Sequence, residues 1–220
     1  MNIPLSCIPT KRDEKWWLER HQLKLEQKAA LNNRANIVLL GDSIVHEWEG
    51  EGSHACREYF GALKLLNLGY AGDRTEHLLW RIENGEIDKF SADYVVVLIG
   101  TNNAGHRHDS PSDIAKGIGL ILDSLSSKLP STKIVLMAIF PRSRHLKKRM
   151  RIRVDKTNEL IKNFADNESI FWLNINAQFL TKDGVLTEDI MPDLLHPNAK
   201  QYEVWGQAIK SLLQSITSEN

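Results

Sequence analysis

The chain has 220 residues, of which 42% are hydrophobic and 25% are charged, an ordinary composition for a globular protein with a sizeable core. Lys plus Arg number 28, as do Asp plus Glu, so the formal net charge is zero and we expect no nucleic-acid partner. No apolar run approaches the roughly 20 residues that span a bilayer, so we expect no transmembrane segment. The first residues do not resemble a signal peptide. We therefore expect a cytoplasmic location, with secretion after removal of a leader left open.

Short apolar segments alternate with helical patterns along the chain. The segment 12–31 predicts a helix, and residues 1–35 are expected to form an N-terminal helical extension packed on the rest. The apolar segments are nearly continuous rather than alternating, which is typical of parallel strands buried on both faces. These predicted strands span 36–40, 63–68, 93–100, 133–140 and 169–175. Helical spacing occurs at 75–84, from Pro111 onward, at 144–166 and from Pro197 onward.

This alternation predicts a single α/β domain over residues 1–220, a three-layer α/β/α sandwich around a parallel sheet. Ligands of such sheets bind at the carboxyl ends of the strands, near the point where the strand order reverses. The residues that directly follow the predicted strands are therefore the first candidates for a functional site.

Four short motifs supply these candidates. GDS (41–43), GYAGD (69–73) and GTNN (100–103) follow the first three strands, and DLLH (193–196) precedes the last helix. Together they provide a hydroxyl, a glycine N–H, a carboxamide and an Asp/His pair, the groups needed for acyl transfer through a serine. Each motif alone has a plainer explanation as a helix cap or a turn, so the interpretation depends on the whole set.

Chemistry gives each of these residues a role. Ser43 needs a base, His196 has a suitable pKa range, and Asp193 can orient the second ring nitrogen of His196. The N–H groups of Ser43 and Gly72 and the amide of Asn102 are candidates for an oxyanion hole. We also expect Ser43 to lie at a helix N-terminus, where the helix dipole favours negative charge. A free histidine titrates near ~6.5, so activity is expected above this pH range.

Three neighbouring residues are predicted to contact the substrate: Asp42, Asn103 and His106. His106 lies in the loop AGHRHDSP (104–111), whose Arg and His side chains suit a polar or sugar-like alcohol. The two histidines of this loop lack a second pair of ligands, so we expect no metal. The basic run RSRHLKKRMRIR (142–153) has apolar residues at helical spacing, which favours a solvent-exposed helix over a site for nucleic acid.

With these motifs the sequence resembles the SGNH, or GDSL-type, hydrolases. Within that family it is most similar to esterases like the catalytic subunits of the intracellular platelet-activating-factor acetylhydrolase. The segments GDRTEHLLWRIENGEID (72–88) and VVVLIGTNN (95–103) carry this closer likeness, which extends over roughly positions 36–215. The resemblance implies a flavodoxin-like five-stranded parallel sheet and esterase activity without a metal or another cofactor. It assigns the nucleophile to Ser43, the oxyanion hole to Gly72 and Asn102, and the acid/base pair to Asp193 and His196.

We therefore expect a serine esterase that hydrolyses short-chain acyl esters, above all acetyl esters, through an acyl-enzyme on Ser43. Its partner is a small-molecule ester, for which a polar or carbohydrate-like alcohol is plausible, and a homodimer is compatible with the sequence. Two alternatives stay open. One is hydrolysis of longer acyl chains by a lysophospholipase or thioesterase, and the other is a catalytically silent binding module on the same scaffold.

Overall fold

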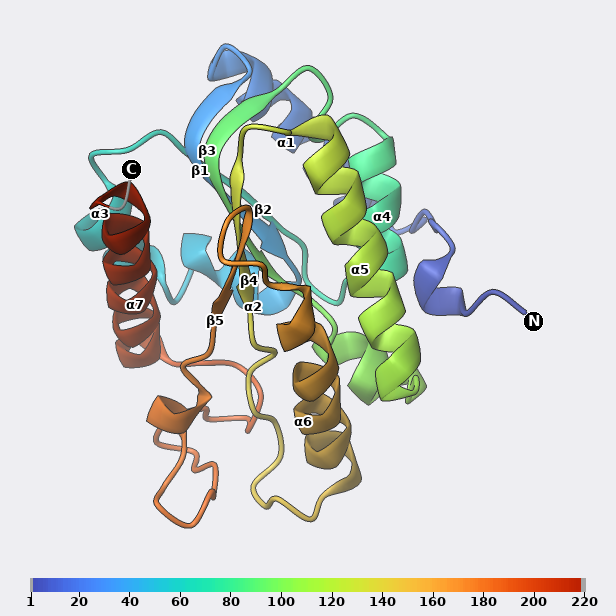
Figure 1. Cartoon of the computed structure of the whole chain (residues 1–220), viewed down its shortest axis with the longest axis vertical. Helices are drawn as coiled ribbons and strands as arrows, with labels where there is room; N and C mark the ends of the chain where they lie inside the picture. The colour runs from blue at the N-terminus through green and yellow to red at the C-terminus, as the bar shows by residue number, and fades with distance from the viewer. Residues whose placement is uncertain (1, 219–220) are drawn as a thin grey trace.

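A five-stranded parallel sheet with the strand order β2-β1-β3-β4-β5 forms the centre of the molecule (Figure 1). The computed structural model describes residues 2–218, so position 1 and positions 219–220 of the predicted domain lie outside the described residues. All neighbouring strands are parallel, and the predicted α/β class is confirmed. The strands are β1 (Arg34–Gly41), β2 (Leu65–Gly69), β3 (Ser91–Leu98), β4 (Lys133–Met137) and β5 (Ile170–Leu173).

Helices cover both faces of this sheet (Figure 1). One face carries α4 (Thr75–Glu83), α5 (Pro111–Lys128) and α6 (Arg149–Ile161). The other face carries α2 (Ser43–His46), α3 (Ser53–Phe60) and α7 (Ala199–Ser218). Short helical turns span Leu5–Cys7, Glu47–Glu49, Asn103–Arg107, Lys162–Phe164 and Asn176–Phe179. Within residues 2–218, no helix is both long and apolar enough to cross a membrane.

The continuous apolar character of the strands follows from their burial on both faces. Along β1, Val38 and Leu40 pack with the helices of the first face, whereas Ile37 and Leu39 pack with those of the second. All four side chains are at most 1% exposed. Successive residues of a strand point to opposite faces, so both sets must be apolar when helices cover both faces.

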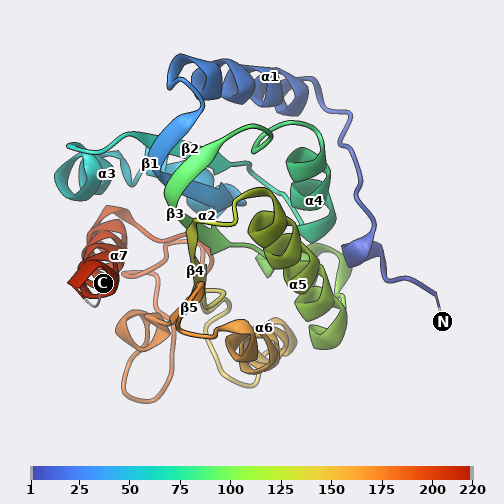
Figure 2. The same cartoon turned by 45° about the horizontal axis from the view of Figure 1, so that its top comes forward.

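The N-terminal segment packs against the edge of the sheet through α1 (Lys15–Ala30), which runs beside β2 (Figure 2). Trp17 of α1 is fully buried, and its ring contacts the rings of Tyr70 and Trp80. Its indole N–H donates to Asp73 Oδ1 at 2.8 Å. This segment therefore reaches the loop that follows β2, where one of the predicted motifs lies.

Two predicted helices begin later than their apolar spacing indicates. The helix expected from 144 begins at Arg149, and the helix expected from Pro197 begins at Ala199. Residues 142–148 form a loop instead, in which Ser143 has φ +66° and its N–H donates to the carbonyl of Leu194. The prediction of a helix over this half of the basic run was wrong, because a contact with a distant loop fixes the backbone there.

The carboxyl ends of β1, β2 and β3 lie level with one another, with Gly41 opposite both Gly69 and Leu98. The chain passes from β1 to β2 on one side and returns to β3 on the other, so the strand order reverses between β1 and β3. A Cβ atom on Gly69 would lie 2.1 Å from the backbone nitrogen of His46. Glycine at this position lets the turn after β1 cross closely over the end of β2.

Candidate active site

Ser43, His196 and Asp193 form a hydrogen-bonded chain at the carboxyl end of β1. Ser43 Oγ lies 2.9 Å from His196 Nε2, and His196 Nδ1 lies 2.6 Å from Asp193 Oδ2. A histidine held in this way can accept the proton of the hydroxyl, while the carboxylate orients the ring and stabilises its charged form. The structure thus brings the three residues predicted for nucleophile, base and orienting acid into direct contact.

The loop that carries Asp193 and His196 is held by the Asp193 side chain itself. Asp193 Oδ1 accepts the N–H groups of Leu195 at 3.0 Å and of His196 at 2.7 Å. Leu194 between them adopts φ +59°, a conformation uncommon for a non-glycine residue. Partial burial raises the pKa of Asp193, but the hydrogen bonds and the charge of His196 outweigh this effect and hold the pKa below its usual value. Asp193 is therefore ionised at neutral pH.

Ser43 is the first residue of α2, a helix of only four residues. Asp42 precedes it as the N-cap, and Asp42 Oδ1 accepts the N–H of Ile44 at 3.0 Å. The expected contribution of a helix dipole at Ser43 is consequently limited to the free N–H groups of one turn. The position of Ser43 at the strand end, rather than a long helix, places its hydroxyl against His196.

Asp42 lies beneath the site as a fully buried carboxyl group. Its Oδ2 has no hydrogen-bond partner among the described residues. Burial raises the pKa of Asp42 to about 7, opposed by the hydrogen bond from Ile44 and by the charge of Arg142. Because the side chain is inaccessible, the structure does not bring Asp42 to the position predicted for a substrate contact.

The three candidate oxyanion donors come from the turns after β1, β2 and β3. Gly72 has φ +77°, which favours glycine, and its N–H donates to no acceptor in residues 2–218. Ser43 N–H lies at the first position of α2 and has no acceptor within that helix. Asn102 is 2% exposed, and its amide donates to the backbone carbonyl of Asp73 at 2.9 Å. A carboxamide has a second N–H, which this hydrogen bond leaves available.

A buried ionic network holds the loop that carries Gly72. Asp73 accepts from Arg81 at 2.9 Å, from Arg12 at 3.1 Å and from the Trp17 indole at 2.8 Å. Burial raises the pKa of Asp73, and the charges of Arg81 and Arg12 oppose that rise. The segment before α1 and the helix α4 therefore both bind the residue that follows the glycine.

Arg81 joins this network to the sheet. Its side chain is fully buried, and it forms a second ion pair with the equally buried Glu86. It also donates to the carbonyls of Gly41 and Leu68, at the ends of β1 and β2, at 3.2 Å each. The guanidinium lies 3.9 Å from the centre of the Tyr70 ring. One cation thus connects two strand ends to the loop after β2.

Asn103, also predicted to contact substrate, holds the neighbouring loops together. It is fully buried, and its Oδ1 accepts the N–H of Thr75 at 3.0 Å. Its amide donates to Thr75 Oγ1, Glu76 and Asp109. The structure therefore places Asn103 below the site, because every polar atom of its side chain is engaged in structural hydrogen bonds.

His106 is the one predicted substrate contact that is exposed. It lines a hollow of about 300 Å³ together with Gly72, Arg12, Arg74 and His77. This places His106 beside the candidate oxyanion loop. Within residues 2–218, no cluster of three His, Cys, Asp or Glu side chains is arranged to hold a metal ion.

A cavity of about 400 Å³ opens directly over Ser43 and His196. Its other walls are charged or polar side chains and prolines: Glu47, Glu51, Pro192, Asp193, Pro197 and Asn198. None of these lining residues is an aliphatic or aromatic side chain of the kind that surrounds a long hydrocarbon. The space next to the serine therefore lacks the large apolar side chains against which a long acyl chain would pack.

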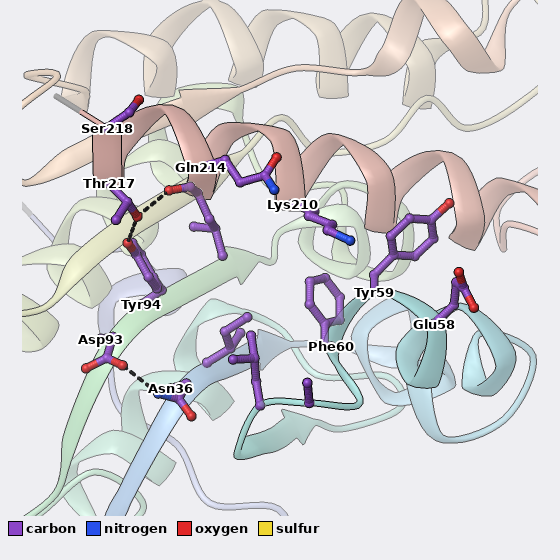
Figure 3. A pocket seen from close by; sticks show the side chains of 14 residues that line it. Asn36, Glu58, Tyr59, Phe60, Asp93, Tyr94, Lys210, Gln214, Thr217 and Ser218 are labelled. Atoms are coloured by element: carbon purple, nitrogen blue, oxygen red, sulfur yellow. Dashed lines mark hydrogen bonds between the residues drawn. The ribbon is translucent and has the colours of Figure 1, made fainter.

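A larger hollow of about 650 Å³ lies at the opposite end of the sheet, between α3 and α7 (Figure 3). Asn36 and Asp93, at the beginnings of β1 and β3, line one side of it, and Phe60 and Lys210 extend from the two helices (Figure 3). No histidine lines this hollow. Its size exceeds that of the Ser43 cavity, but it lacks a base next to a hydroxyl, so chemistry rather than volume identifies the candidate active site.

A parallel sheet with a Ser-His-Asp chain at its strand-order reversal is an arrangement typical of α/β hydrolytic enzymes. The model of the GDSL-like Lipase/Acylhydrolase family matches residues 39–204. The chain belongs to this family and is a hydrolase. The predicted family is confirmed.

Relatives over nearly the full chain include subunits of one named enzyme. Platelet-activating factor acetylhydrolase IB subunit alpha1 of Homo sapiens is 30% identical over 212 residues, which cover 94% of this chain and 87% of the relative. Subunit alpha2 of Rattus norvegicus is 27% identical over 218 residues, which cover 99% of this chain and 91% of the relative.

Solved structures share the fold. A GDSL-like lipase from Bacteroides thetaiotaomicron superposes with a TM-score of 0.71 at 16% identity, covering 92% of this chain and 98% of that one. An acetylxylan esterase from Geobacillus stearothermophilus superposes with a TM-score of 0.62 at 15% identity, covering 80% and 92%. At these identities the likeness shows the fold.

Proposed function

We propose that the protein is a serine esterase that hydrolyses short-chain acyl esters, above all acetyl esters, through an acyl-enzyme on Ser43. The observation that carries the proposal is the hydrogen-bonded chain from Ser43 through His196 to Asp193. Only acyl transfer uses all three groups in this order.

In the first half of the reaction, Ser43 Oγ forms a bond to the ester carbonyl carbon while its proton moves to His196 Nε2. The carbonyl π bond opens, and its electron pair goes to the oxygen. When the tetrahedral intermediate collapses, the bond to the alcohol oxygen breaks and His196 gives its proton to the leaving alcohol. A water molecule then repeats the sequence, releases the acid and restores Ser43.

The charge on the former carbonyl oxygen requires donors that are already in place. Three donors are suitable: the N–H groups of Ser43 and Gly72 and the second amide N–H of Asn102. None of the three donates a hydrogen bond to an acceptor within the described chain. Donors fixed before the reaction stabilise the transition state without the cost of reorganising solvent. The network around Asp73 supports this role, because it restrains the Gly72 loop from two sides.

The preference for a short acyl group rests on the absence of Leu, Ile, Val, Met, Phe, Tyr and Trp side chains from the described lining of the Ser43 cavity. Hydrocarbon chains gain about 0.8 kcal/mol for each buried CH₂ group, and this cavity offers few apolar partners for them. The names of the relatives support the same preference. The human relative is named an acetylhydrolase, and one structural neighbour is an acetylxylan esterase.

The test is hydrolysis of p-nitrophenyl esters from acetate to palmitate by the wild type and by Ser43→Ala. A matched control is Ser127→Ala, which alters an exposed serine of α5 far along the chain from the motifs. We expect turnover that peaks at acetate, disappears in Ser43→Ala and persists in the control. A peak at long chains would replace the proposal with a lysophospholipase or thioesterase. Absence of turnover on every ester, including acetylated sugars, would indicate a silent scaffold.

A further inference from the structure

A second cavity, of about 630 Å³, adjoins the Ser43 cavity, and Asp193 lines both. One side of it consists of the loop after β4, with Arg142, Arg144, His145 and Lys148. The other side is the 193–195 loop that positions His196. Of the four sequence motifs only DLLH (193–196) contributes to this cavity, and the rest of its lining belongs to the basic run 142–153.

Arg142 is the unusual member of this cavity. It is only 9% exposed, and its Nη1 donates to the carbonyl of Thr101 at 2.6 Å and to Thr101 Oγ1 at 3.2 Å. Within residues 2–218, no carboxylate forms a direct ion pair with it, although the charges of Asp42 and Asp193 act on it from a greater distance. Its Nε and Nη2 have no hydrogen-bond partner among these residues. A nearly buried guanidinium without a direct ion pair is unfavourable, and a bound anion would offset that cost.

The remaining charges leave the cavity positive. Arg144 pairs with Glu188, whereas the side chains of Lys148 and His145 contact no partner in the described part of the chain. Asp193 is the one carboxylate in the lining, and its two oxygens are occupied by the 195 and 196 N–H groups and by the His196 ring. The Ser43 cavity, by contrast, contains Glu47 and Glu51. An anion is therefore attracted to the Arg142 side of the site rather than to the Ser43 side.

We propose that the Arg142 cavity binds a negatively charged group, a carboxylate or a phosphate, on the alcohol part of the ester. This inference rests on the proposed function. The cavity borders the loop of His196, the residue that protonates the leaving alcohol, so it lies on the side of that alcohol. Arg142 has two nitrogens without a partner in the described chain, Nε and Nη2, on one planar guanidinium, a geometry suited to carboxylate and phosphate oxygens, and Lys148 adds a mobile charge.

The test compares three acetyl esters that differ in charge: 4-acetoxybenzoate, 4-acetoxyphenyl phosphate and the neutral methyl 4-acetoxybenzoate. Arg142→Met should lower kcat/KM for the better anionic ester about 10- to 100-fold more than for the neutral ester, the effect of losing hydrogen bonds to a charged group. Lys148→Ala should lower the ratio of kcat/KM for the anionic ester to kcat/KM for the neutral ester about 2- to 10-fold. Lys147→Ala, a neighbouring exposed lysine that does not line the cavity, should leave the ratio unchanged. Whichever of the two anionic esters loses more identifies the group as carboxylate or phosphate.

Arg142 also holds Thr101, next to Asn102, so its loss has a structural effect on the site. An equal fall for charged and neutral esters would mean that Arg142 only supports this turn, and it would overturn the proposal. Calorimetric binding of the anionic esters to Ser43→Ala provides a readout without turnover. If the wild type hydrolysed none of the esters but binding still depended on Arg142, the esterase would be refuted and the anion site would stand. Hydrolysis of the neutral ester together with Arg142-independent binding would refute the anion site alone.

Discussion

Replacement of Arg81 by Met tests the buried network that supports the site. Arg81, Asp73 and Glu86 are all fully buried, so the variant leaves two carboxylates without their main counter-ion. The carbonyls of Gly41 and Leu68 lose a donor as well. Breaking a buried ion pair from one side costs about 3–5 kcal/mol, and two pairs break here, so we expect about 5 kcal/mol. This is a large part of the roughly 5–15 kcal/mol that stabilises a typical domain.

The pH dependence of this loss provides a second check. In the wild type, burial already raises the pKa of Asp73, whereas at Glu86 the charge of Arg81 and the hydrogen bonds together outweigh burial and hold the pKa below its usual value. Without Arg81, burial should raise the folded-state pKa values of both carboxyl groups relative to the wild type, above their unfolded values near ~4. The folded variant then binds more protons than the unfolded chain, so its stability falls as the pH rises. The loss should therefore be smaller at pH 5 than at pH 8.

The assay is urea unfolding followed by tryptophan fluorescence at both pH values. Arg34→Met serves as the control, because Arg34 forms an ion pair with Asp93 in which the side chains are 56% and 36% exposed. Exposed pairs contribute at most about 1 kcal/mol. If Arg81→Met costs no more than this control, the network does not stabilise the fold and the reasoning is refuted.

Three further predictions concern the site itself. Asn102→Ala should lower kcat on p-nitrophenyl acetate about 10²- to 10³-fold, as expected for an oxyanion donor, and a loss under threefold would exclude that role. Asp193→Asn should keep the fold but lower kcat on the order of 10³-fold or more, because His196 loses the acceptor that fixes its proton; activity within tenfold of wild type would contradict this. Asp42→Asn should gain stability relative to wild type as the pH rises from 5 to 8. Burial raises the pKa of Asp42 to about 7, so ionisation of the unfolded chain above ~4 disfavours folding, and the variant is free of this penalty. Urea unfolding across this range would show a constant difference if Asp42 were unperturbed.

Much of the fold could be predicted because burial on two faces leaves a local signal. The apolar runs located all five strands, since each residue along a strand such as β1 alternates between two covered faces. The order of the strands carries no such signal in the residues, and it entered the prediction through the family resemblance alone. Helix starts were less accurate, because the backbone of Ser143 and Arg144 forms hydrogen bonds with the distant Leu194 and Leu186, and the spacing of apolar residues contains no sign of these contacts.

The sequence also predicted only part of the candidate site. Ser43, Gly72 and Asn102 were found because residues after parallel strands converge at one edge. Asn102 and Asn103 are adjacent and chemically identical, so the sequence could not show that only Asn103 has its whole amide engaged in loop hydrogen bonds. Arg142 follows β4, and the same rule applied to that strand would have found it. Arg81 lies inside a helix, where its burial depends on Asp73 and Glu86 in ways that spacing cannot reveal.

The central claim is a covalent intermediate on Ser43, and mass spectrometry of the enzyme quenched during turnover of p-nitrophenyl acetate tests it most directly. The account predicts that the peptide containing Ser43 gains the mass of one acetyl group. The gain should be absent in Ser43→Ala and should accumulate further in His196→Ala if that variant still reacts, because water then lacks its base. Turnover by the wild type with no acetylated peptide, or with the acetyl group on another residue, would contradict the account.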